Sequence, residues 1–234
     1  MLPCLLKLYY VKIEDFIFLT YGKDNDQSVL ENFHTAAFYK ILQKSSSNIL
    51  QNLSEKDYKY FRKLSINLIL DTDLTKHFII LSKFKNIADS LQMTEENDRF
   101  LSLSIALKCA DVCHGAKELG LHKRWSRRII EEFFGQGDKE RKFHIPVTPS
   151  CDRAGNISKG QQGFLNFIVL PLFEAFDQKF FTEEMKQTVT QQIRKNLGYW
   201  ESEIPHEEKG KSNFMEETAK VLEDIALEAG TDAK

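Results

Sequence analysis

The stretch FLSLSIALKCADVCHG, residues 100–115, is the most informative about the fold class. Apolar and small side chains occupy nearly all of its positions, a pattern typical of a helix that is buried on most sides. Gly115 is expected to end this helix. A carboxylate in such a helix is costly unless it is paired or bound to a metal, so Asp111 stands out. The pattern does not decide between a metal ligand and a structural aspartate that pairs with a nearby Lys or Arg or bonds a helix end.

Apolar residues recur at helical spacing along most of the remaining chain. Ser54, with acidic residues just after it, is typical of a helix N-terminus. Gly135 and Gly137 are expected to end one helix and Pro171 to bend another, while residues 138–160 are expected to form a long ordered loop. The expected helices cover residues 28–44, 54–70, 73–84, 95–114, 121–134, 159–180, 182–200 and 213–229. Because no segment has a strand pattern, the predicted fold class is all-α.

Composition and charge exclude several classes of protein. With 42% hydrophobic and 28% charged residues, a chain of 234 residues can bury a core without disulfides. The net charge of −2 provides no basic surface, so no nucleic-acid partner is expected. Four charges interrupt the apolar residues 1–20, so no membrane span is expected. Four cysteines without a CxxC pair favour reduced thiols and a cytoplasmic location.

Cys109, Cys113 and His114 lie close together in the sequence. Their spacing fits none of the common zinc signatures. Packing in the core is therefore their expected role.

Two acidic groups precede Asp111. Asp73 follows the expected helix 54–70, where capping explains an acidic residue, and His77 lies four residues later on the same helical face. That spacing could suit a metal, although such a pair more often only hydrogen-bonds. Glu31 and His34 lie three residues apart, and the simplest interpretation is a capped helix start with an exposed Glu31.

Gln161 and Phe164 lie at the start of the expected helix 159–180. A Gln amide offers both a donor and an acceptor, so it can match the edge of a planar heterocycle in either orientation. A phenylalanine one turn later could stack on such a ring. Taken alone, helix capping and core packing are the more frequent roles of these residue types.

Six segments, taken together and in order, resemble the class I cyclic-nucleotide phosphodiesterase family. They are YGKDNDQSVLENFH (21–34), LSINLILDTDLTKHF (64–78), ALKCADVCHGAK (106–117), RWSRRIIEEFFGQGDKER (124–141), GQQGFLNFIVLPLFEAF (160–176) and NLGYW (196–200). The resemblance covers residues 19–206 and implies a compact, multi-helix, all-α catalytic domain of the HD type without its N-terminal helices. Residues 1–18 do not resemble the family, and residues 207–234 are expected to form a charged tail with a helix.

The resemblance also implies roles in substrate binding. Gln161 corresponds to the glutamine that binds the purine edge. Phe164 and Ile129 correspond to the side chains that sandwich the base. His114 lies where family members differ in their substrate contacts, so it bears on base preference. We expect Asp111, Gln161, Phe164 and Ile129 to line one cleft.

A second set of implied roles concerns metals. Asp111 corresponds to the carboxylate that binds the tightly held metal, usually zinc, and it also lies beside the substrate. Glu31 and Asp73 correspond to acidic positions near the metal pair, outside the ligands themselves. In the complete domain, zinc together with magnesium or manganese polarises the phosphate and lowers the pKa of a bridging water that attacks phosphorus.

The family's His-rich segment has no counterpart upstream of Tyr21 in this chain. That segment holds the proton-donating His and further metal ligands, so the resemblance implies no catalytic proton donor here and only one metal ligand, Asp111. We therefore expect an N-terminally truncated hydrolase of cAMP, cGMP or both. A non-catalytic regulatory or binding relative that retains the purine pocket is the alternative. A cyclic nucleotide is the expected partner, and a homodimer remains an open option.

Overall fold

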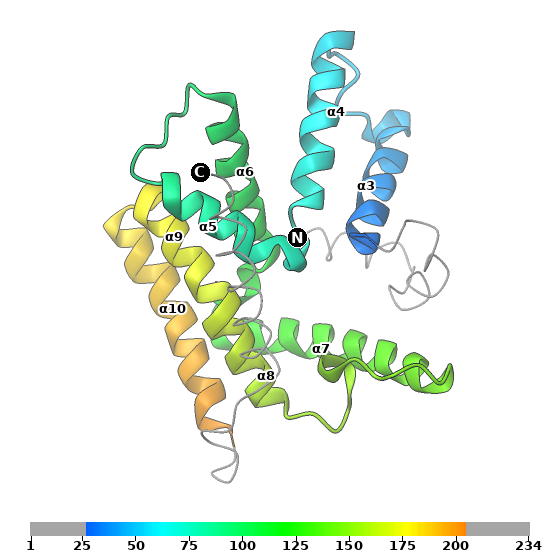
Figure 1. Ribbon diagram of the computed structural model, residues 1–234, viewed down its shortest axis with the longest axis vertical. Coiled ribbons are helices and arrows are strands. Elements are labelled where there is room, and N and C mark those ends of the chain that lie inside the picture. The colour runs from blue at the N-terminus through cyan, green and yellow to red at the C-terminus, as the bar shows by residue number, and fades with distance from the viewer. Residues whose placement is uncertain (1–26, 205–234) are drawn as a thin grey trace, which may run out of the picture. The chain divides into compact units, whose positions relative to one another are not determined.

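The computed structural model describes residues 27–204, and no strand occurs within this range (Figure 1). The all-α prediction is therefore confirmed. The chain divides into two compact units, whose described parts are residues 27–77 with 92–111 and residues 78–91 with 112–204. None of the helices between residues 27 and 204 has the length and apolar character that crossing a bilayer requires. The expected helix 213–229 lies outside the described residues.

The first unit begins with a helical hairpin. Helices α3 (Val29–Leu42) and α4 (Glu55–Leu70) pack against each other, and the loop between them contains the 3-10 turn η2 (Ser45–Ser47) (Figure 1). Their shared core is apolar and aromatic and consists of Tyr39, Leu42 and Leu50 with Phe38, Phe61 and Ile66 around them. Helical spacing puts the α3 and α4 members of this core on the facing sides of the two helices, and Leu50 joins them from the loop.

Side chains cap the start of α4 and the turn that follows it. Ser54 Oγ accepts a hydrogen bond from the Asp57 amide at 3.1 Å, as the sequence predicted. Beyond α4, Asp73 Oδ1 accepts a bond from the Thr75 amide at 2.8 Å and so caps the 3-10 turn η3 (Leu74–Lys76). The capping role expected at Asp73 is therefore confirmed.

Helix α6 (Glu96–Asp111) packs on α4, and its buried side is more polar than the sequence indicated. Ser104 Oγ donates to Asp71 Oδ2 at 2.6 Å, and Lys108 Nζ donates to the Asp71 carbonyl at 2.9 Å. Leu103, by contrast, is 44% exposed. Leu103 is the one exposed residue between positions 100 and 115, so the prediction of a helix buried on most sides is confirmed. Small side chains bring one side of α6 close to the polar end of α4.

α6 ends at Asp111, earlier than predicted, and the 3-10 turn η4 (Cys113–Ala116) follows it. Gly115 does not end α6. A Cβ at this position would lie 2.9 Å from Val169 Cγ1 and 3.0 Å from Leu165 Cδ2. The glycine is needed because η4 approaches these side chains closely within the second unit.

The second unit is organised around α10 (Glu183–Ser202), which follows its N-cap Thr182, the residue at which the sequence predicted a helix to begin. α10 contacts η4, α7 (Leu119–Lys142), α8 (Ile157–Gly163) and α9 (Leu170–Phe180). The most deeply buried apolar side chains of this unit are Phe84, Leu165, Val169, Leu172 and Ile193. Phe84 belongs to α5 (His77–Ile87).

α7 runs through Gly135 and Gly137 to Lys142, so the prediction that these glycines end the helix is wrong. A Cβ at Gly137 would lie 2.1 Å from the backbone oxygen of Cys151 in the turn η5 (Pro149–Cys151). The glycine therefore permits a helix-to-backbone contact. Because α7 continues, the expected loop 138–160 shrinks to residues 143–156, with η5 inside it.

The expected helix 159–180 is divided into three pieces: α8, the π-helical segment η6 (Phe164–Val169), and α9. Pro171 lies at the start of α9. Proline has no amide hydrogen for the bond to the preceding turn, and a wider π turn just upstream adapts the helix to this loss. The sequence predicted a bend at Pro171 and did not indicate the π-helical segment before it.

Candidate functional site

Three acidic side chains singled out from the sequence interact electrostatically in the first unit. Glu31 belongs to α3, Asp73 precedes η3, and Asp111 ends α6. Burial, together with the nearby charges of Asp73 and Asp111, raises the pKa of Glu31 to about 7. Glu31 is half-buried, so the expectation of an exposed side chain is wrong.

Asp73 is held by hydrogen bonds on both carboxylate oxygens. Ser28 Oγ donates to Oδ2 at 2.7 Å, while the Thr75 amide and hydroxyl each donate to Oδ1 at 2.8 Å. Burial opposes the charged form, but these bonds outweigh it, and the pKa of Asp73 lies below its usual value. Ser28 makes no side-chain bond to the start of α3 and adopts a left-handed backbone conformation with φ of 47°. The serine therefore joins α3 to η3 instead of capping α3.

Lys108 lies among these carboxylates. Its Nζ donates to the backbone oxygens of Asp71 at 2.9 Å and Asp73 at 3.4 Å. Burial lowers the pKa of Lys108 to about 8, against the opposing effect of Asp71 and Asp111. Burial raises the pKa of Asp111, and the charge of Lys108 counteracts this. Lys108 thus supplies the nearby cation that the structural interpretation of Asp111 required.

Residues 27–204 contain no group of three or more His, Cys, Asp or Glu side chains arranged to hold a metal ion. A structural zinc site needs four ligands and a catalytic one needs three from the protein. Both carboxylate oxygens of Asp73 are already bonded, which leaves Asp111 as the predicted ligand. The donors in the described part of the chain therefore do not make up a complete metal site.

A histidine of the same unit gives a testable pH dependence. His34 is 5% exposed, and its Nε2 has no hydrogen-bond partner within residues 27–204. Burial lowers its pKa from 6.5 to about 4. Between these two values the unfolded chain binds a proton that the folded chain does not, so the free energy of unfolding falls as the pH drops from 6.5 towards 4.

We expect the free energy of unfolding of His34→Phe to fall by about 1–3 kcal/mol less than that of the wild type when the pH drops from 6.5 to 4. Urea unfolding of the variant and the wild type at several pH values measures the difference. His144→Phe, a change at an exposed histidine, is the control. Equal acid sensitivity in His34→Phe and the wild type would contradict the assignment.

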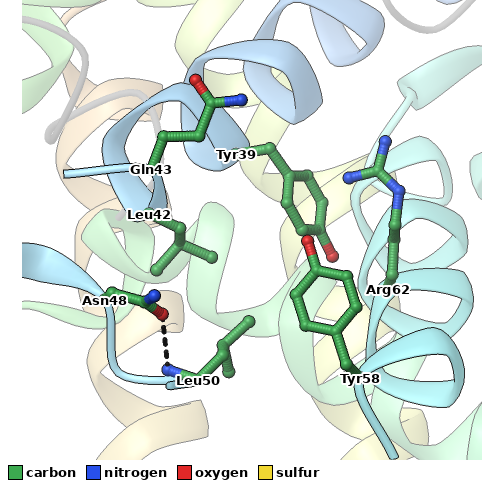
Figure 2. Close-up of a pocket in the computed structure, with 7 residues that line it drawn as sticks. All are labelled: Tyr39, Leu42, Gln43, Asn48, Leu50, Tyr58 and Arg62. Carbon is green, nitrogen blue, oxygen red and sulfur yellow. Dashed lines mark hydrogen bonds between the residues drawn. The ribbon is translucent and has the colours of Figure 1, made fainter. Parts of the chain in front are cut away.

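The first unit also contains a small cavity of about 170 Å³ between α3, the following loop and α4 (Figure 2). The Tyr39 and Tyr58 rings line it, and the Arg62 guanidinium lies 4.1 Å from the centre of the Tyr39 ring. On the opposite wall, Asn48 Oδ1 accepts a hydrogen bond from the Leu50 amide at 3.1 Å (Figure 2). None of the predicted site residues lines this cavity.

The predicted base-binding residues Gln161, Phe164 and His114 all lie in the second unit. Gln161 is on α8, and Phe164 follows one turn later at the start of η6. The side-chain oxygen of Gln161 is buried and has no hydrogen-bond partner within residues 27–204. Phe164 stacks on His114, with ring centres 5.9 Å apart and planes 7° apart. The fold therefore brings together Phe164 and His114, which are 50 residues apart in the chain.

Ile129 is a half-buried residue of α7 in the same unit. Asp111 belongs to the first unit. The prediction that Asp111, Gln161, Phe164 and Ile129 line one cleft involves both units and stays a prediction.

Three residues beside His114 were not recognised as site residues from the sequence. His122 lies in α7, and Asn196 and Trp200 lie in α10. Asn196 Nδ2 donates to the backbone oxygens of Gly115 and Lys117, each at 2.8 Å, and so holds η4 in place. Asn196 and Trp200 do belong to the family-like segment NLGYW, but the segment alone did not indicate what they contact.

Comparison with known proteins places the chain among cyclic-nucleotide phosphodiesterases. The sequence model of the 3'5'-cyclic nucleotide phosphodiesterase family matches residues 6–193, a range that starts and ends earlier than the motif-based 19–206. The "Probable 3',5'-cyclic-AMP phosphodiesterase pde-4" of Caenorhabditis elegans is 34% identical over 192 residues, or 78% of this chain and 28% of the relative. The "Dual 3',5'-cyclic-AMP and -GMP phosphodiesterase beta" of Plasmodium falciparum is 37% identical over 188 residues, or 78% of this chain and 16% of the relative.

A third relative and a solved structure agree. The "3',5'-cyclic-AMP phosphodiesterase, isoform F" of Drosophila melanogaster is 36% identical over 190 residues, 77% of this chain and 28% of the relative. The solved structure "Structure of LmjPDEB1 in complex with IBMX" is 26% identical with a TM-score of 0.71, covering 83% of this chain and 58% of that one. This chain thus spans 16–28% of the lengths of the three relatives. The family implies dependence on divalent metals. The chain belongs to the 3',5'-cyclic nucleotide phosphodiesterase family.

Proposed function

We propose that this chain supplies the base-binding pocket of a phosphodiesterase that hydrolyses 3',5'-cyclic nucleotides to 5'-nucleoside monophosphates. The observation that carries the proposal is the buried side-chain oxygen of Gln161, which has no partner within residues 27–204. A buried acceptor without a hydrogen bond is costly, and a bound ligand that donates to it removes the cost. The amino group of adenine and the N–H of guanine are both such donors.

The surroundings of Gln161 suit a purine. Phe164 lies one helical turn away and offers an aromatic face for the base, and Ile129 is the apolar side chain proposed for the opposite face. Asp111 is proposed to bind a divalent metal at the phosphate. A complete metal site needs ligands beyond those of residues 27–204, so the role proposed for these residues is recognition of the base.

Two further proposals rest on the comparisons and on the cysteine content. The relatives' printed names all describe phosphodiesterases, so a non-catalytic binding protein is not the favoured function. A cytoplasmic location is supported by four cysteines with no CxxC pair.

Titration calorimetry with cAMP and cGMP tests the pocket directly. We expect the 234-residue chain to bind at least one of them and Gln161→Ala to weaken that binding about tenfold or more. The matched control is Gln178→Ala, because Gln178 is exposed on α9 in the same unit. Absence of binding by the folded wild-type chain, or equal affinity in Gln161→Ala, would refute the proposal.

A further inference from the structure

The cavity between α3 and α4 has the size and the walls of a site for one aromatic ring. Figure 2 shows the rings of Tyr39 and Tyr58 on one side and Leu42 and Leu50 on the other. Its volume of about 170 Å³ is close to the roughly 150 Å³ of an apolar cavity that binds benzene. A drug-sized ligand needs about 300 Å³ or more, so a whole nucleotide does not fit.

The mouth of this cavity is polar, although the two leucines in its wall are buried. Tyr58 is 39% exposed, and Arg62 is exposed as well. The Tyr39 hydroxyl is already engaged, because it lies 2.5 Å from Ser65 Oγ. Within residues 27–204, by contrast, the Arg62 guanidinium has no carboxylate partner and the Tyr58 hydroxyl makes no hydrogen bond. Both groups can therefore bind a ligand.

Arg62 is placed to bind an anion at this mouth. Its guanidinium lies over the Tyr39 ring, 4.1 Å from the ring centre. The five N–H donors of a guanidinium lie in its plane, so contact with a ring face leaves them available. Their fork matches the two oxygens of a carboxylate. The contact with Tyr39 also restricts the arginine side chain, so less rotational freedom is lost when a ligand binds.

The charge around the cavity also favours an anion. Residues 40–63 contain six Lys or Arg and two acidic residues, an excess of four positive charges. Both acidic side chains already have partners, because Glu55 Oε1 lies 2.6 Å from Lys59 Nζ and Asp57 Oδ2 accepts a hydrogen bond from Ser54 Oγ at 2.7 Å. Neither of them lines the cavity. The local potential is therefore positive and attracts anions.

We propose that this cavity is a binding site for a small aromatic carboxylate. The ring lies between the two tyrosines and the two leucines, and the carboxylate accepts hydrogen bonds from Arg62 at the mouth. The volume selects a single ring, and Arg62 with the surrounding charge selects a ring that carries a negative group. The site shares no residue with the proposed base pocket, so the inference does not depend on the proposed function.

Titration of the ¹⁵N-labelled 234-residue chain with three probes tests the proposal by NMR. Benzoate has both the ring and the carboxylate, benzyl alcohol has the ring without the charge, and acetate has the carboxylate without the ring. We expect benzoate to shift the amide signals of residues 39–62 with a Kd on the order of 1 mM, and the other two probes to bind about tenfold more weakly. The proposal fails if benzoate leaves these signals unchanged, or if either of the other probes binds as tightly as benzoate.

Arg62→Gln removes the proposed anion-binding group and, because Arg62 is exposed, leaves the core intact. We expect the affinity for benzoate to fall about tenfold and that for benzyl alcohol to change less than about twofold. Lys63→Gln is the matched control, since Lys63 is the next residue of α4, is exposed, carries the same charge and does not line the cavity. An equal loss of benzoate affinity in the two variants would show that only the net charge matters, and would rule out Arg62 as the binding group.

Discussion

With Zn²⁺ and Mg²⁺ supplied, the 234-residue chain is expected to hydrolyse cAMP and cGMP at least about 10²–10⁴-fold more slowly than a complete catalytic domain of its family, because general acid catalysis alone contributes that much. The chain has six histidines, and His34 is the first of them. No histidine therefore lies upstream of Tyr21, in agreement with the lack of a counterpart to the family's His-rich segment.

The two early histidines, His34 and His77, are poorly placed to act as the proton donor. His34 is buried, and its lowered pKa of about 4 keeps it neutral near pH 7. His77 is completely buried, so it cannot reach a leaving group in solvent. The incomplete set of metal donors within residues 27–204 adds to the expected loss of rate, because water that is not bound to a metal has a pKa near 15.7 and is a poor nucleophile.

Two measurements on the purified chain check this prediction. Elemental analysis gives the metal content, and a turnover assay gives the rate of hydrolysis. A catalytic domain of the Caenorhabditis elegans relative, assayed in parallel, is the positive control. Stoichiometric metal together with a rate close to that of the control would show that this chain has ligands and a proton donor that we have not identified.

Gly137→Ala is expected to lower the free energy of unfolding by about 1–3 kcal/mol or more. The added methyl group would lie 2.1 Å from the Cys151 oxygen, and the obstructing atom belongs to the backbone of η5. A flexible side-chain end could move aside, but here α7 or the whole turn must shift. The shift would also disturb Glu140, one turn later, which accepts hydrogen bonds from the Thr148 amide at 2.7 Å and hydroxyl at 2.9 Å.

Gly198→Ala is the matched control for this change. Gly198 is an exposed residue within α10, and a Cβ there meets nothing within 4 Å. An alanine in the interior of a helix is favoured over glycine, so we expect a gain of about 0.5–1 kcal/mol. Urea unfolding of both variants measures the two effects. If both alanines stabilise the protein, Gly137 is not a site of close approach.

The comparison of these two glycines shows why some helix ends could not be predicted. Gly137 lies within α7 and Gly198 within α10, and from sequence alone either glycine could be interpreted as a helix end. α7 continues through Gly137 because its partner, Cys151, lies 14 residues further along the chain. A local pattern carries no information on such a partner, and the same limitation applies to Gly115 and its contact with Val169.

The sequence by itself determined the all-α class, the helix starts at Ser54 and Thr182, and the family, because helical periodicity, caps and ordered motifs are properties of neighbouring residues. It singled out Gln161, Phe164 and His114, but not what they touch. Only the tertiary structure decided that the Gln161 oxygen is buried without a partner, and that His114 is connected through His122 to Trp200. The His122–Trp200 bond joins residues 78 positions apart, and the position of a proton on an imidazole depends on such distant donors and acceptors, which meet only when the helices have packed.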